Sequence, residues 1–214
     1  MKNVTITLAA VLVLMVTSSV VQAAGDQWVT DFEAAKASAK AGGKYLLVDF
    51  TGSDWCGWCV KLKKEVFDQD HFKKEAPKNF ILVELDFPKR TKLDPKLTAQ
   101  NRKLSQEYGV RGFPTILLMD ADGKVFGKTG YQAGGPEKYI VHLKEMVEAK
   151  KAFDKLIAQA DKAKGIEKAK LLDKALGSAP AVVRKSRTDL AEIIIELDKD
   201  DKAGLKTKYA AQAA

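Results

Sequence analysis

Cysteine and histidine are scarce in this 214-residue chain, which contains two of each. A small domain stapled by disulfides needs several cysteine pairs. A zinc site needs four ligands, so the cysteines would have to meet His71 and His142 from distant positions. We therefore expect no disulfide framework, no metal site and no bound cofactor.

Long hydrophobic runs are also missing. The apolar stretch at residues 4–16 is shorter than the roughly 20 residues of a membrane-spanning helix, and threonines interrupt it. It follows Lys2 and precedes small and polar residues that end at Ala23, as in a secretory signal peptide. We predict a signal peptide over residues 1–23 and a product that is periplasmic or secreted. No cysteine near the cleavage point offers attachment for a lipid.

Nucleic-acid motifs are absent, although the formal net charge is +8. This excess could favour an acidic partner or a membrane surface. Lysines and acidic residues nevertheless alternate along the expected helices, as they do on solvated faces. We therefore expect no nucleic-acid partner.

Residues 24–149 alternate strand and helix patterns, which predicts an α/β domain. Short apolar runs indicate strands that are covered on both faces. The expected strands are residues 44–50, 80–86, 115–119 and 124–126. A helix between the first two strands implies a parallel pair with a crossover, and Asp-Gly after the third implies a tight hairpin. The prediction is a central mixed sheet with helices on both faces.

Helix boundaries are indicated by capping and breaking residues. Thr30 and Glu33 have the spacing of a capping box, with Thr30 as the N-cap, and Gly42-Gly43 ends that helix. Gly134-Gly135-Pro136 interrupts the chain before a helix that runs from Glu137 toward Lys150.

Residues 150–214 are rich in Ala, Lys, Asp and Leu and have no strand pattern. Apolar residues recur at helical spacing, and Gly165 and Pro180 mark breaks between helices. This pattern predicts an all-α extension. Its apolar faces are typical of packing surface, and they also allow contact with a partner or a second copy of the chain.

Cys56 and Cys59 form a Cys-x-x-Cys pair between an expected strand and an expected helix. A helix start directs free N–H groups at the first sulfur and favours the thiolate, which predicts Cys56 as the nucleophile. Cys59, one turn later, would resolve the mixed disulfide. A structural role is disfavoured because so short a loop constrains little of the unfolded chain.

Three segments resemble the thioredoxin superfamily, in the expected order: Val48-Asp49-Phe50, Trp55-Cys56-Gly57-Trp58-Cys59, and residues 108–115. The resemblance implies that Pro114 follows a cis peptide bond and faces the cysteines, with the Phe113 backbone free to pair with an extended substrate. It implies that Asp49 is a buried acid that assists proton transfer. The implied substrate-binding residues are Trp55, Gly57, Trp58, Phe113 and Pro114.

Departures from the thioredoxin pattern indicate a subgroup. Glu84 stands where thioredoxins usually have a lysine near the buried acid, and Asp49 lies one residue further from Cys56. Trp58 provides no cation at the second intervening position, so a strongly oxidising site is less expected. Residues 51–56 and the insertion over 87–104 are similar to exported reductase-type members, such as the C-terminal domain of the reductant transporter DsbD.

The sequence therefore predicts a thiol-disulfide oxidoreductase that acts on protein disulfides or thiols, as a reductase or isomerase, with an unidentified electron donor or acceptor. A disulfide-forming oxidase is the alternative within the enzyme class. Outside it stands a binding protein whose fold presents a peptide groove and whose extension docks a partner.

Overall fold

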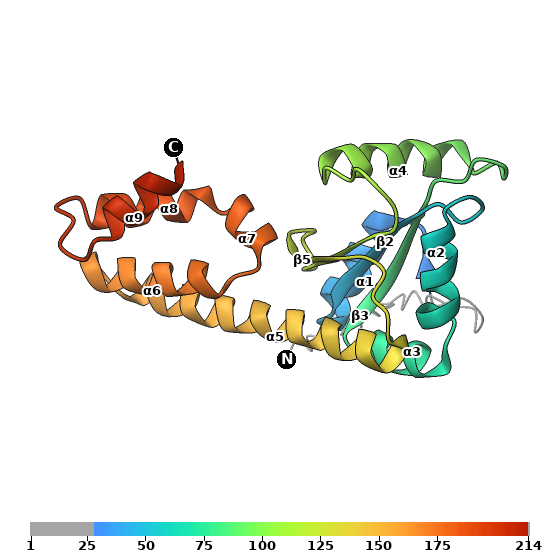
Figure 1. Cartoon of the computed structure of the whole chain (residues 1–214), viewed down its shortest axis with the longest axis horizontal. Helices are drawn as coiled ribbons and strands as arrows, with labels where there is room; N and C mark the ends of the chain where they lie inside the picture. Colours follow the sequence, from blue (N-terminus) through green and yellow to red (C-terminus); the bar gives the residue numbers. More distant parts are fainter. Residues whose placement is uncertain (1–27, 214) are drawn as a thin grey trace, which may run out of the picture.

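The computed structural model describes residues 28–213. It contains a compact α/β domain and a helical arm that extends from it (Figure 1). The predicted signal peptide lies outside the described residues. Within residues 28–213, none of the helices combines the length and the apolar character that crossing a membrane requires.

The sheet has five strands in the order β1-β3-β2-β4-β5. β1 and β2 run parallel to β3, whereas β4 is antiparallel to both β2 and β5, so the sheet is mixed as expected. The strands are β1 (Trp28–Val29), β2 (Tyr45–Thr51), β3 (Phe80–Asp86), β4 (Thr115–Met119) and β5 (Val125–Thr129). The short edge strand β1 was not predicted, because two residues carry no periodicity.

Alternation along β2 assigns its side chains to two cores, because successive side chains of a strand point to opposite faces. Leu46, Val48 and Phe50 belong to one buried cluster, which also contains residues of α1 and α4. Leu47 belongs to the other cluster, with residues of α2, α3 and α5. Asp49 has the same parity as Leu47 and is therefore directed to the face that carries the cysteines.

The helices cover both faces of the sheet, and α4 and α5 lie on opposite sides of it (Figure 1). The first face carries α1 (Phe32–Gly42) and α4 (Pro95–Glu107), and the second carries α2 (Gly57–Leu62), α3 (Asp70–Glu75) and α5 (Gly135–Lys162). A π-helical segment, Lys63–Phe67, continues α2, and a 3-10 turn, Ala76–Lys78, follows α3.

The N-cap of α1 corrects a sequence prediction. Asp31 is the cap, and its carboxylate accepts the N–H of Ala34 at 2.9 Å. Thr30 instead uses its carbonyl to accept from Gln100, on α4. Gln100 also accepts the Phe32 N–H at 3.1 Å, which is one of the N–H groups that a Thr30 side chain would bind as the cap. This long-range contact cannot be read from the local spacing. The predicted end at Gly42-Gly43 is confirmed, with Gly43 in the left-handed conformation that favours glycine.

Helix α5 connects the domain to the arm without interruption at Ala149. Its first half packs on the sheet, and its second half carries the buried side chains of Phe153 and Ala160. The arm continues with α6 (Gly165–Ser178), α7 (Ala181–Ser186), α8 (Thr188–Leu197) and α9 (Leu205–Ala213). One apolar cluster extends from the sheet into these helices, and α7 contacts the edge strand β5.

Candidate active site

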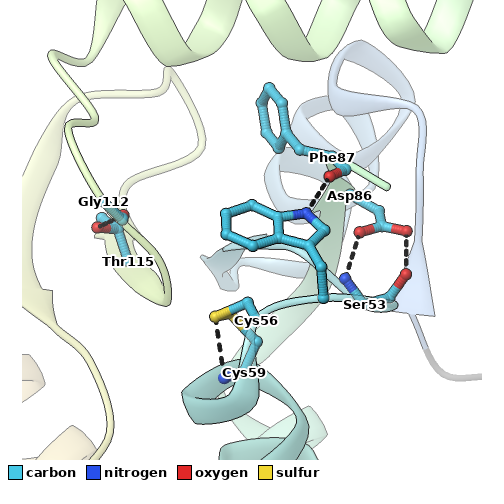
Figure 2. The surroundings of a disulfide bond; sticks show 8 residues. Ser53, Cys56, Cys59, Asp86, Phe87, Gly112 and Thr115 are labelled. Atoms are coloured by element: carbon cyan, nitrogen blue, oxygen red, sulfur yellow. Dashed lines mark hydrogen bonds between the residues drawn. A yellow bond between two sulfur atoms is a disulfide. The ribbon is translucent and has the colours of Figure 1, made fainter. Parts of the chain in front are cut away.

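The two cysteines lie where β2 gives way to α2. The backbone N–H of Cys56 donates to the carbonyl of Gly52 at 2.9 Å, which closes the turn after the strand. Cys56 is the N-cap of α2, and its sulfur accepts the N–H of Cys59 at 3.2 Å (Figure 2). The two residues are joined by a disulfide, and 7% of Cys56 and 3% of Cys59 are exposed.

Trp55 forms one wall beside the disulfide. Its indole N–H donates to the Phe87 carbonyl at 2.8 Å, and 39% of the residue is exposed. Gly52 lies so close beneath the indole that a Cβ there would be 2.7 Å from Trp55 Cε2. A side chain at Gly52 would therefore displace the ring, which explains the glycine in this turn.

The segment after β3 is attached to the turn that precedes Cys56. Ser53 donates both its N–H and its hydroxyl to the Asp86 carboxylate, at 2.9 and 2.6 Å (Figure 2). The Asp54 carboxylate accepts the backbone N–H groups of Lys89, Arg90 and Thr91 at 2.8–2.9 Å. These N–H groups, that of Lys89 foremost, lower the pKa of Asp54 to about 2. No pattern in the sequence predicts this attachment, because it joins residues that are 35–37 positions apart.

A second segment approaches from the start of β4. The Phe113–Pro114 peptide bond is cis, and the Phe113 ring packs edge-on against Trp55 at 5.8 Å between centroids. Behind the cis bond, the Thr115 hydroxyl donates to the Gly112 carbonyl at 2.8 Å and closes the loop (Figure 2). The Phe113 ring thus lies beside the cysteine turn, and Pro114 follows it through the cis bond.

Trp58 flanks the disulfide on the helix side and is 57% exposed. Its ring lies 5.1 Å from that of Tyr131, whose hydroxyl donates to Glu65 at 2.6 Å. At the neighbouring position, Gly57, a Cβ would meet no atom within 4 Å. The surface over the first turn of α2 is therefore open and partly aromatic.

Asp49 lies beneath the cysteines and borders a cavity of about 290 Å³ that Cys59 also lines. Only 6% of Asp49 is exposed, and its buried Oδ1 has no hydrogen-bond partner among the described residues. Burial first, and then the negative charges of Glu84 and Asp86, raise the pKa of Asp49 well above its ordinary value, while Lys63 opposes the shift. The carboxyl group therefore holds a proton more readily than an exposed aspartate does.

The charged neighbours of Asp49 differ from the thioredoxin pattern. Glu84 is its register partner on β3 and lines the same cavity. The cations that line this cavity are Lys63 and Lys64, which begin the π-helical segment four residues after Cys59. The departure at Glu84 could be read in the sequence. The contribution of Lys63 could not, because it depends on where the helix after the cysteines is directed.

The histidines stand apart from the cysteines. His142 contacts the Thr129 hydroxyl at 3.1 Å from α5, and His71 is exposed on α3. Over residues 28–213, no three His, Cys, Asp or Glu side chains gather closely enough to hold a metal ion.

Comparison with known proteins gives matches over the same region. Residues 32–147 match the model of the thioredoxin-like domain family. The chain is 35% identical over 124 residues to a disulfide bond reductase, DsbH, of Chlamydia pneumoniae, which covers 58% of this chain and 74% of that protein. A solved structure of a DsbH oxidoreductase superposes with a TM-score of 0.54 at 31% identity, over 56% of this chain and 83% of that one.

Other relatives match over smaller shares of their length. A thiol:disulfide interchange protein, DsbD, of Pseudoalteromonas atlantica is 33% identical over 94 residues, which is 44% of this chain and 14% of that protein. These matches and the Cys56–Cys59 pair agree on one chemistry. The chain belongs to the thioredoxin-like domain family and is a thiol-disulfide oxidoreductase.

Proposed function

We propose that this protein reduces or isomerises protein disulfides through Cys56. The supporting observation is the asymmetry of the pair: the Cys56 sulfur caps α2 and accepts an N–H, whereas Cys59 faces the cavity of Asp49. An N–H donor aimed at sulfur favours the thiolate. In the dithiol state, the Cys56 thiolate attacks a substrate disulfide, and one substrate thiol leaves.

The resolving step assigns a role to Asp49. The Cys59 thiol must lose its proton before its sulfur attacks Cys56 in the mixed disulfide and releases the second substrate thiol. A carboxylate at Asp49 takes that proton directly or through a water in the cavity. The protein ends as the disulfide and the substrate as two thiols, so two electrons have moved to the substrate.

Substrate binding is assigned to the surface around the disulfide. Phe113 and Pro114 present backbone beside the cysteines, and an extended substrate segment would pair there. Trp55 and Trp58 provide apolar contact on either side, and the open space at Gly57 allows the substrate to approach. Protein disulfides and thiols are therefore the proposed partners, together with an electron donor that restores the dithiol.

Reduction, rather than oxidation, is the proposed direction. The residue between Gly57 and Cys59 is Trp58, which gives no positive charge to stabilise the thiolate further. DsbH, the relative described above, is named a disulfide bond reductase. Measurement of the reduction potential tests the direction: we expect a value near or below about −200 mV, and a value near −120 mV would indicate the oxidase alternative.

Export is part of the proposal. The pattern of residues 1–23 supports cleavage after Ala23 and a periplasmic or secreted product. Mass analysis of the protein recovered from a bacterial periplasm should give a chain that starts at Ala24. Recovery of an intact Met1 terminus in the cytoplasm would overturn this part.

A second proposed role, docking of a partner, belongs to the arm, residues 150–214. The arm contains a cavity of about 1000 Å³ between α6, α7, α8 and α9. Its lining is apolar at Leu176, Ala191 and Ile195 and charged at Arg184, Lys185, Arg187, Glu192 and Lys208. Such a cavity can receive an apolar segment of a partner. Protection of α8 from hydrogen exchange by a native partner would support this role, and full function without α8 and α9 would contradict it.

A further inference from the structure

Two lysines stand over the two tryptophans that flank the disulfide. Lys89 Nζ lies 3.8 Å from the centre of the Trp55 ring. Lys61 Nζ lies 5.2 Å from the Trp58 ring and 5.0 Å from that of Tyr131. Cation–π attraction favours both positions, so each of the two tryptophans holds a positive charge on its ring.

The position of Lys89 is fixed by its backbone. Its N–H donates to the Asp54 carboxylate at 2.9 Å, and Asp54 directly precedes Trp55 in the chain. The Phe87 carbonyl, two residues earlier, accepts from the same indole that Lys89 covers. Lys89 is therefore part of an ordered structure shared with the cysteine turn, and it differs in this respect from an isolated surface lysine.

Cations outnumber acids in the segment that follows β3. Residues 88–94 contain three cations, Lys89, Arg90 and Lys92, and one acid, Asp94, which is occupied as the N-cap of α4. Exposed Arg111 adds a charge on the loop before Pro114.

The nearby carboxylates are engaged by the protein itself. Asp54 accepts three N–H groups, and Glu65 contacts Lys61 at 3.9 Å and Tyr131. Lys89 has no ion pair within the described part of the chain. Of the two lysines over the tryptophans, Lys89 therefore retains the larger unneutralised charge.

We propose that this basic rim makes the protein select disulfides whose neighbouring residues are acidic. A carboxylate next to a substrate cysteine would contact Lys89 or Lys61 while the disulfide lies against Trp55 and Trp58. Complementary charge speeds encounter and disfavours basic segments. The inference rests on the proposed function, because it names the substrate class of that same site.

The test uses three matched peptides, each with one intramolecular disulfide flanked by Glu, Gln or Lys. The full-length protein is reduced, freed of reductant and mixed with each peptide, and the single-turnover rate is followed by tryptophan fluorescence at low salt. We expect the Glu peptide to react about tenfold faster than the Lys peptide, and the difference to shrink in 0.5 M salt because exposed charges are then screened.

Variants identify the source of the selectivity. Lys89→Gln should reduce the ratio of the Glu-peptide rate to the Lys-peptide rate about threefold, and Lys61→Gln should reduce it less. Lys89→Arg keeps the charge and should keep the native ratio. Lys155→Gln is the matched control, because it removes one exposed charge from the arm side of α5; the ratio should not change. The rate with the Gln peptide should stay within about twofold in Lys155→Gln, and in the variants of Lys89 and Lys61 it should change less than the rate with the Glu peptide.

The outcomes separate this inference from the proposed function. Equal rates for the three peptides, or a ratio that survives Lys89→Gln and Lys61→Gln together, would overturn the selection of acidic substrates and leave disulfide reduction intact. No reduction of any peptide would instead contradict the proposed function.

Discussion

Different interactions stabilise the active-site end of the sheet and the helical arm. At the active site, hydrogen bonds join segments that are more than 30 residues apart in the chain. Ser53 donates to the Asp86 carboxylate, Asp54 accepts the Lys89 N–H, and Trp55 donates to the Phe87 carbonyl. In the arm, apolar faces carry the contact, and buried Leu172, Leu190 and Ile194 belong to one continuous cluster.

This difference indicates a division of work. Hydrogen bonds are directional, so a network of them positions the cysteine turn against residues 86–91 with defined geometry. Apolar packing depends mainly on volume and area, and it allows a surface to vary without loss of the fold. We therefore expect changes at the active site to alter chemistry, and changes in the arm to alter stability and docking.

The largest effect expected at the active-site end is that of Cys56→Ser. Removal of the attacking sulfur should lower reduction of any disulfide to the uncatalysed rate, a loss of at least about 1000-fold, because a serine hydroxyl is almost never ionised near pH 7. Thermal unfolding of the arm, followed by helix signal, should be nearly unchanged. Residual turnover within tenfold of the native rate would show that Cys56 is not the nucleophile.

Asp49→Asn should separate chemistry from stability within the same domain. Loss of the proton acceptor should slow the resolving step about 10- to 100-fold at pH 7. The same substitution should raise the free energy of unfolding near and above neutral pH. Because burial raises the pKa of Asp49, the native state favours the protonated form, and stability is lost as pH rises from about 4 through the native pKa.

The Asn variant cannot ionise, so it should unfold at higher denaturant than the native protein at pH 8, and the gap should narrow toward pH 4. Quenched-flow kinetics and denaturation at the two pH values provide the measurements. Unchanged resolution together with unchanged pH dependence would remove Asp49 from the mechanism.

Ile194→Ala should show the reverse pattern in the arm. Ile194 is fully buried in α8, so truncation leaves a cavity and should cost about 2–4 kcal/mol in the free energy of unfolding. The reduction rate of a small disulfide should stay within about twofold. Ile193→Ala is the matched control, because Ile193 is 39% exposed. Its truncation should lower the free energy of unfolding much less. A large loss of rate in Ile194→Ala would mean that the arm shapes the active site.

The smallest effect expected concerns the loop attached to Asp54. Three N–H groups lower its pKa to about 2, so their contribution is complete above the ordinary value of 3.8 and is lost as pH falls toward 2. Asp54→Asn should therefore raise the hydrogen-exchange rates of residues 89–91 severalfold at pH 6, and the difference from the native protein should disappear near pH 2. Equal exchange at pH 6 would show that the carboxylate does not hold the loop.

Sequence patterns predicted the parts of the fold that depend on residues close together in the chain. The apolar runs placed β3 and β4 at their observed bounds, and β2 within one residue, because a strand covered on both faces consists mostly of apolar residues. The Cys56–Cys59 spacing and the break at Gly42-Gly43 are also local. These features need no knowledge of the rest of the chain.

Features that depend on distant partners were missed. Asp31 rather than Thr30 caps α1, and Gln100 accepts the Phe32 N–H that a Thr30 cap could bind. The attachment of residues 89–91 to Asp54 joins positions 35–37 residues apart. Neither contact has a periodic signature, and both become visible only when the sheet brings the segments together.

Capture of the mixed disulfide tests most directly whether Cys56 is the attacking sulfur. The Cys59→Ala variant is incubated with a disulfide peptide, quenched with acid and analysed by mass spectrometry after digestion. We predict one peptide per chain, attached at Cys56, and no stable adduct on the Cys56→Ala variant. An adduct that forms on Cys59 of Cys56→Ala, with none on Cys56, would contradict the assignment of Cys56 as the attacking sulfur.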